Sequence, residues 1–120
     1  MAKSLESLEC MKVIQWRDAN KLIYPELGLL IHVPNEGRRS VQEGIKLGKM
    51  GLTKGVADFL LISRILALEM KTETGKQTKE QEEFERLIWR FGGEYHLVRS
   101  AIECVAKIKW CLGIPYQGMP

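Results

Sequence analysis

The chain has 120 residues and a mass of 13.7 kDa, so we expect residues 1–120 to form a single domain around one core. With 45% hydrophobic and 28% charged residues and a net charge of +3, the composition excludes a disordered chain. No apolar run approaches the ~18 residues that span a bilayer. The charged N-terminus does not resemble a signal peptide, so we expect a cytoplasmic protein with no membrane contact. Three cysteines, with no Cys-x-x-Cys pair and no paired histidines at metal spacing, lead us to expect neither a disulfide framework nor a zinc site.

Hydrophobic periodicity and turn residues predict four helices and four strands in the order α-β-α-β-β-α-β-α. Two helix starts carry a capping-box pattern, Thr78 with Gln81 and Ser100 with Glu103. This order predicts an α/β domain in which helices flank a central sheet. The expected helices cover residues 4–22, 40–50, 78–91 and 100–111, and the expected strands cover 27–33, 56–62, 65–71 and 95–99.

The basic residues are concentrated in one segment between Pro34 and Gly55. Its five cations and two anions give a local charge of +3, which equals the net charge of the whole chain. Such a segment is either a solvated basic loop or a surface for a polyanion. The five cations are Arg38, Arg39, Lys46, Lys49 and Lys54.

The two central strands bring two carboxylates together. If Ser63 and Arg64 form the connection, Asp58 lies opposite Glu69, and Lys71 projects to the same face two residues later. Opposed like charges are unfavourable, and a divalent cation such as Mg²⁺ removes that conflict. The alternative is a surface ion pair of Glu69 with Lys71, with Asp58 as an ordinary residue at a strand end.

Two further polar residues lie on apolar helix faces. Gln81 belongs to the stripe that contains Phe84 and Ile88, so its amide needs a partner, unless it only completes the capping box. Glu9 falls on the packed face of the first helix, where a carboxylate is costly unless it is paired or bound to a cation. A lysine or arginine partner is the alternative for Glu9.

These residues resemble those of a known family. Asp58 followed by Glu69-Met70-Lys71 is similar to the D…(D/E)xK core of the PD-(D/E)XK nucleases. More specifically, the chain resembles the virus-type replication-repair nuclease (VRR-NUC) domain from about residue 7 to residue 105. The resemblance rests on the order and spacing of several segments: an N-terminal helix with Glu9, IHVPNEGRR, GLTKGVADFLLI, LALEMK, TKEQ and GGEYHLV. Where the family often has proline before the aspartate, this chain has Ala57.

The resemblance implies a restriction-endonuclease-like mixed sheet flanked by helices, and Mg²⁺- or Mn²⁺-dependent hydrolysis of phosphodiester bonds in branched or flap DNA. Asp58 and Glu69 correspond to metal ligands, with the Met70 carbonyl as a further ligand. Lys71 corresponds to the residue that orients or activates the attacking water. Gln81 corresponds to the family's helix glutamine. Glu9 is favoured over Glu6 as the N-terminal acid, and it is a further candidate for the metal.

The same resemblance implies two binding partners, DNA and a second copy of the chain. The five cations would hold the DNA backbone, since phosphate contacts position a protein without reading sequence. Compact members of the family act as homodimers, so we expect a second copy, with Trp89, Trp110 and residues 114–120 as candidate contacts or as core residues. The alternative functions are a non-catalytic nucleic-acid-binding module and an RNA-directed nuclease.

Overall fold

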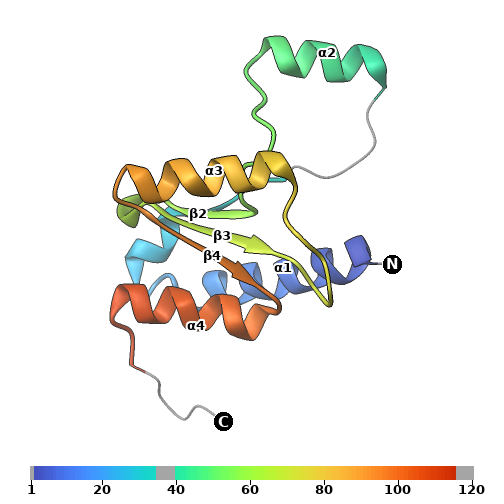
Figure 1. Ribbon diagram of the computed structural model, residues 1–120. Coiled ribbons are helices and arrows are strands. Elements are labelled where there is room, and N and C mark those ends of the chain that lie inside the picture. Colours follow the sequence, from blue (N-terminus) through green and yellow to red (C-terminus); the bar gives the residue numbers. More distant parts are fainter. Residues whose placement is uncertain (1, 35–39, 116–120) are drawn as a thin grey trace.

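The computed structural model describes residues 2–34 and 40–115, and for residues 2–4 the backbone only. The described elements follow the predicted order of helices and strands, with two short 3₁₀ helices added (Figure 1). The α-helices are α1 (Ala2–Asn20), α2 (Val41–Lys49), α3 (Lys79–Arg90) and α4 (Ala101–Leu112). The strands are β1 (Leu30–His32), β2 (Phe59–Leu61), β3 (Leu66–Met70) and β4 (Glu94–Val98). The 3₁₀ helices are η1 (Pro25–Leu29) and η2 (Ile62–Arg64).

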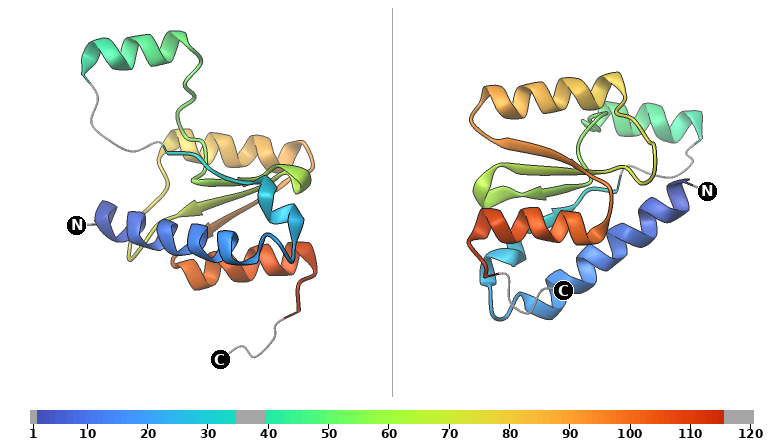
Figure 2. Two further views of the ribbon diagram at one scale, coloured as in Figure 1. Left: turned by 180° about the vertical axis from the view of Figure 1, so that it is seen from behind. Right: turned by 60° about the horizontal axis from the view of Figure 1, so that its bottom comes forward.

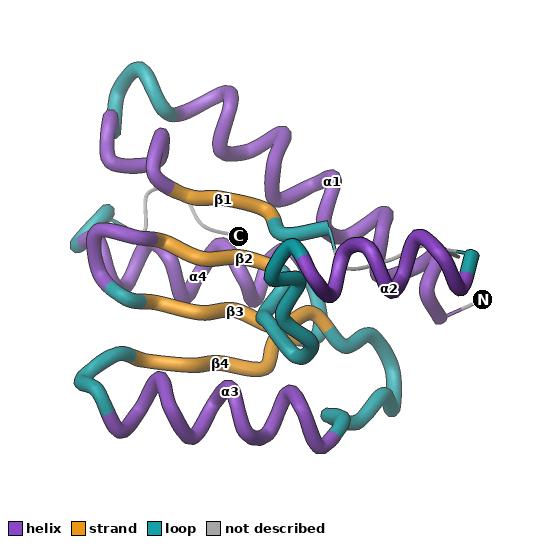
Figure 3. Tube along the Cα trace, turned by 90° about the horizontal axis from the view of Figure 1, so that it is seen from above, coloured by secondary structure: helices purple, strands orange, loops and turns teal. Residues whose placement is uncertain are grey.

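The four strands form one mixed sheet in the order β1-β2-β3-β4 (Figure 3). β1 and β2 are antiparallel, β2 and β3 are antiparallel, and β3 and β4 are parallel. Leu60 pairs with Ala67 and Leu61 with Leu66, which confirms the predicted register of the two central strands. The fold class predicted from the sequence, a mixed sheet with helices on its faces, is therefore confirmed.

The two faces of the sheet carry cores of different size. On one face α1 and α4 cover the larger core, to which β2 contributes Phe59 and Leu61 and β3 contributes Leu68 and Met70 (Figure 2). On the other face, under α3, a smaller cluster contains Ala57, Ala67 and Tyr95. Because successive residues of a strand point to opposite faces, Glu69 lies on the α3 face while Met70 is buried in the larger core.

Local capping explains why the helices begin where they do. In α3 the Thr78 hydroxyl accepts a hydrogen bond from Gln81 N at 3.1 Å, and Thr78 N donates to Gln81 Oε1 at 2.9 Å, as the predicted capping box requires. In α4 only half of the predicted box forms. Ser100 accepts from Glu103 N, but the Glu103 carboxylate accepts from Arg99 N instead of Ser100 N. None of the helices in the described segments is both long and apolar enough to cross a membrane.

The first predicted strand is shorter than expected. Residues 27–29 belong to η1, so the expectation of a strand over 27–33 is wrong for its first half. Pro25 stands at the start of η1, where its constrained φ favours a helical turn, and the turn buries Leu27 completely. The β2–β3 connection is likewise a four-residue loop, η2 followed by Ile65 at φ 50°, which preserves the register because it widens symmetrically.

Helix α2 has no buried residue and lies apart from the sheet (Figure 1). Val41 is 79% exposed and Ile45 is 55% exposed, although they lie four residues apart on one helix face. A nine-residue helix is marginal without packing against another surface. The apolar face of α2 is thus left open in the single chain.

Candidate active site

Asp58 and Glu69 meet where β2 and β3 begin to diverge. The register of the two strands, continued by one residue beyond Phe59 and Leu68, sets Asp58 opposite Glu69. The Asp58 carboxylate accepts a hydrogen bond from Met70 N at 2.7 Å, so it takes the place of a main-chain acceptor between the strands.

Glu69 is the most unusual ionisable group of the site. Only 3% of the residue is exposed, and its Oε1 is buried without a hydrogen-bond partner among the described residues. Burial and the adjacent charge of Asp58 raise the pKa of Glu69 well above its ordinary value of 4.5, and the Lys71 ammonium only partly opposes them. A cation placed between the two carboxylates would remove this unfavourable interaction.

Lys71 and Gln81 both face Glu69 Oε2. The Lys71 Nζ lies 3.9 Å from this oxygen, and the Lys71 side chain is only 14% exposed. Gln81 Nε2 donates to the same oxygen at 3.1 Å, while Gln81 Oε1 serves the capping box of α3. The two roles considered for Gln81 therefore occur together, because its amide offers an acceptor and a donor in opposite directions.

The structure gives Glu9 of α1 two partners. Glu9 Oε1 accepts from Ala101 N at 2.8 Å at the start of α4, and Glu9 Oε2 contacts Lys12 Nζ at 2.7 Å. These bonds, chiefly the one from Ala101, lower the pKa of Glu9 and tie α1 to α4. Glu6, three residues earlier, adds its charge to those that raise the pKa of Glu69. Glu9 is thus engaged at the start of α4, and which of Glu6 and Glu9 acts as the N-terminal acid stays a prediction.

Arg99 is a residue that the sequence analysis did not single out. Its Nη1 donates to the carbonyl oxygens of Lys71, Glu73 and Gly75 at 3.1, 3.2 and 2.6 Å. Arg99 follows β4 directly, so it fastens the loop that leaves β3 at Lys71. The only sequence signal for this role is an arginine directly after one strand, next to a strand that ends in a polar loop. This combination is too common in proteins to identify such a residue.

Gly55 determines how α3 approaches the strand that carries Asp58. It adopts φ +87°, and a Cβ at this position would lie 2.3 Å from the carbonyl oxygen of Glu80 in the first turn of α3. Because Gln81 is the next residue, the close approach sets the distance from Gln81 to Glu69.

We expect Gly55→Ala to be destabilising by about 2 kcal/mol or more, since both the backbone angle and the contact with α3 resist a side chain. A thermal melt of the variant checks this. Gly92→Ala is the control for the backbone angle alone, because Gly92 also has φ +87° but nothing lies within 4 Å of a Cβ there. An equal loss of stability in the two variants would contradict the proposed contact.

The predicted DNA-binding cations fall into two groups. Arg38 and Arg39 lie outside the described residues. Lys46 and Lys49 are exposed on α2, and Lys54 is exposed in the turn that follows. The segment from α2 to Gly55 leads to the end of the sheet where β2 begins, next to the first turn of α3 (Figures 1 and 3). These three cations therefore belong to the same end of the molecule as the carboxylates.

Comparison with known proteins supports the fold. Protein-family models and curated proteins gave no match to this sequence. A solved structure described as a VRR_NUC domain protein matches with a TM-score of 0.73 and 18% sequence identity, over 92% of this chain and 89% of that chain. At this identity the similarity establishes a shared fold, which is the fold that the sequence resemblance implied.

Proposed function

We propose that this chain is a single nuclease domain that hydrolyses phosphodiester bonds of DNA with the help of Mg²⁺ or Mn²⁺. The observation that carries the proposal is the buried Glu69 carboxylate, with its unpartnered Oε1, next to Asp58 and Lys71. Such a cluster is unfavourable in the protein alone, and perturbed carboxylates of this kind are typical of functional sites. The shared fold with a VRR_NUC domain protein supports the same conclusion.

The donor set fits a hard divalent cation. Asp58 and Glu69 would hold the ion, with the Met70 carbonyl and Glu6 as further oxygen donors, and carboxylate and carbonyl oxygens are the ligands that Mg²⁺ and Mn²⁺ prefer. When bound, the ion would stabilise negative charge on the phosphoryl oxygens and make a bound water more acidic. Glu6 replaces Glu9 in this proposal, because Glu9 is engaged at the start of α4.

The remaining residues would position the reactants. The Lys71 ammonium would hold the attacking water, and only its neutral amine form could accept a proton from that water; the side chain is 14% exposed and lies beside Glu69. Gln81 would keep Glu69 in place through its 3.1 Å hydrogen bond. Arg99 would hold the backbone of Lys71 and of the loop that follows.

The exposed cations of α2 and of the turn after it would contact the phosphate backbone. Removal of Lys46 and Lys49 together should weaken DNA binding and lower the slope of log affinity against log salt by about 2, since each lost phosphate contact lowers it by about 0.9. Fluorescence anisotropy over a range of salt concentrations measures this slope. The control is Lys107→Ala, an exposed lysine of α4. A slope in the double variant equal to that of the parent would refute the assignment.

A second copy would cover the open apolar face of α2. Val41 and Ile45 have no packing partner within the described part of the chain that buries them, and Trp110 is 85% exposed, so it is not the core residue considered above. We expect a homodimer, which would carry two sites and suit branched DNA. Light scattering after gel filtration should give twice the chain mass for the parent and a monomer for Ile45→Glu. A monomeric parent at micromolar concentration would contradict this.

The direct test is cleavage. The purified protein with Mg²⁺ or Mn²⁺ is incubated with single-stranded, duplex, flap and four-way DNA and with RNA of the same sequences. We expect cleavage of branched DNA above all. Binding without cleavage of any substrate would indicate the non-catalytic module, and cleavage of RNA alone would indicate an RNA-directed enzyme.

A further inference from the structure

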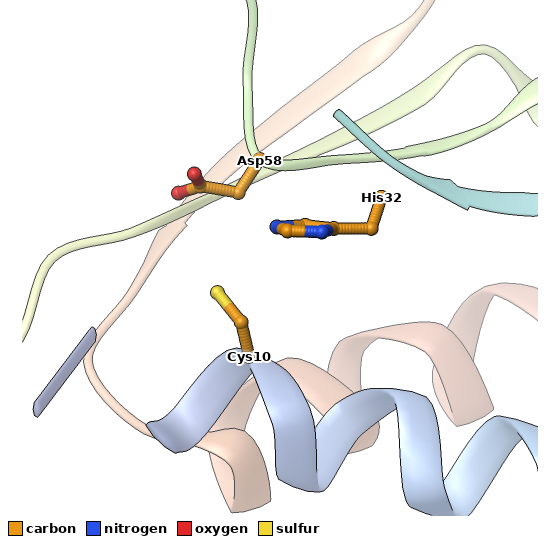
Figure 4. A group of neighbouring side chains, drawn as sticks. All are labelled: Cys10, His32 and Asp58. Atoms are coloured by element: carbon orange, nitrogen blue, oxygen red, sulfur yellow. The ribbon is translucent and has the colours of Figure 1, made fainter. Parts of the chain in front are cut away.

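A second group of potential metal ligands adjoins the carboxylate pair on its other side. Cys10 of α1, His32 of β1 and Asp58 each offer one ligand atom, and these atoms all lie within 4.8 Å of one another. The side chains of Cys10 and His32 point into the space between α1 and β1, and the Asp58 side chain lies beside them with its carboxylate turned away from the imidazole ring (Figure 4). Asp58 thus belongs both to this group and to the pair with Glu69.

The chemistry of this group differs from that of the carboxylate pair. A thiolate, an imidazole nitrogen and one carboxylate oxygen favour Zn²⁺, whereas Mg²⁺ takes oxygen ligands. Four-coordinate zinc places its ligand atoms about 3.3–3.8 Å apart, so a closure of about 1 Å would complete the three protein positions. A water molecule would supply the fourth ligand.

Two further observations point to a ligand at this place. His32 Nε2 is buried and has no hydrogen-bond partner among the described residues, which is costly for a ring nitrogen. Cys10 and His32 also line a surface cleft of about 420 Å³ between α1 and β1, together with Ser7, Met11, Ile14 and Gln15. Although Cys10 is only 3% exposed, this cleft offers an ion a path to the cluster.

We infer that Cys10, His32 and Asp58 form a zinc-binding site that competes with the Mg²⁺ or Mn²⁺ site for Asp58. Binding of Zn²⁺ releases the proton of the Cys10 thiol and draws the Asp58 carboxylate toward α1, away from Glu69. The competition rests on the proposed nuclease function, while the zinc site itself does not. Zinc would therefore oppose loading of the carboxylate pair by the harder ion.

Metal titrations of the purified, reduced protein test the site directly. With CoCl₂ as a spectroscopic substitute for zinc, the parent should show a thiolate-to-cobalt charge-transfer band at one equivalent, and ZnCl₂ should abolish the band. Loss of a group that only orients a metal ligand lowers affinity 10–100-fold, so Cys10→Ser and His32→Gln should each weaken zinc binding by at least about 100-fold. Cys111→Ser is the matched control, since Cys111 lies near Glu26 and Arg64. Circular dichroism verifies that each variant is folded.

Competition is measured without relying on cleavage. One equivalent of ZnCl₂ should lower the affinity for Mn²⁺, followed by the electron paramagnetic resonance signal of free Mn²⁺, at least tenfold in the parent and not in His32→Gln. Absence of the cobalt band, or equal zinc affinity in the parent and Cys10→Ser, would overturn the site. Unchanged Mn²⁺ affinity in the zinc-loaded parent would also overturn the inference, because it requires a shared Asp58. A parent that binds zinc in these titrations, but that cleaves no nucleic acid when it is freed of zinc and supplied with Mn²⁺, would refute the nuclease proposal alone.

Discussion

Replacement of Lys71 by alanine should lower the rate of DNA cleavage by about 10³-fold and leave DNA affinity nearly unchanged. The Lys71 ammonium lies 3.9 Å from Glu69 and is largely shielded from water, so its position suits contact with the attacking water more than contact with the DNA backbone. Loss of a positioned proton-transfer group costs about 10²–10⁴-fold in rate. Single-turnover cleavage with excess protein measures the chemical step, and anisotropy in metal-free buffer measures binding.

The control for Lys71→Ala is Lys21→Ala. Lys21 lies just beyond the C-terminal end of α1 and pairs with Asp18 at 3.3 Å, away from the carboxylates. The Lys21→Ala variant should cleave DNA at the parental rate. Lys71→Arg is also informative, because a planar guanidinium keeps the charge but not the compact donor geometry of an ammonium. Cleavage by Lys71→Ala at the parental rate would reject the assigned chemistry, whereas a parallel loss of rate and affinity would show that Lys71 mainly binds DNA.

Replacement of Glu69 by glutamine should abolish cleavage and yet make the metal-free protein more stable. Burial and the charge of Asp58 raise the pKa of Glu69 above 4.5, so the folded state holds a proton at Glu69 more tightly than the unfolded state does. The contribution of Glu69 to stability is therefore fully present below pH 4.5 and is lost as the pH rises through the raised pKa. A neutral amide does not ionise, so its contribution to stability does not fall with rising pH. At pH 7.5 we therefore expect the free energy of unfolding of Glu69→Gln to exceed that of the parent by about 1–3 kcal/mol, or Tm by several degrees.

Thermal melts at several pH values and metal concentrations test this expectation. The gain of Glu69→Gln over the parent should shrink as the pH falls toward 4.5, and Mn²⁺ or Mg²⁺ should raise the Tm of the parent but not of the variant. Glu82→Gln, an exposed carboxylate on α3, should change stability little at any pH. A metal-free Glu69→Gln protein less stable than the parent at pH 7.5 would contradict the electrostatic account of the site.

Several features of the site were determined by the sequence alone, because they depend on local rules. The register of Asp58 and Glu69 follows from strand alternation and a symmetric loop, so it survives the change from a two-residue to a four-residue connection. The capping box of Thr78 and Gln81 is likewise local, and it orients the Gln81 amide toward β3. Such features depend on residues close in sequence, whose relative positions the backbone geometry largely dictates.

Only the tertiary structure decided which residues of distant segments meet. Glu6 and Glu9 are less than one helical turn apart, and only the packing of α1 against α4 shows that Glu9 reaches the start of α4. The hydrogen bonds from Arg99 to the loop after β3 depend on the parallel pairing of β3 and β4, which no local sequence pattern reveals. The approach of Cys10 to Asp58 arises in the same way, because a packing angle between helix and sheet is set by the whole core rather than by any single segment.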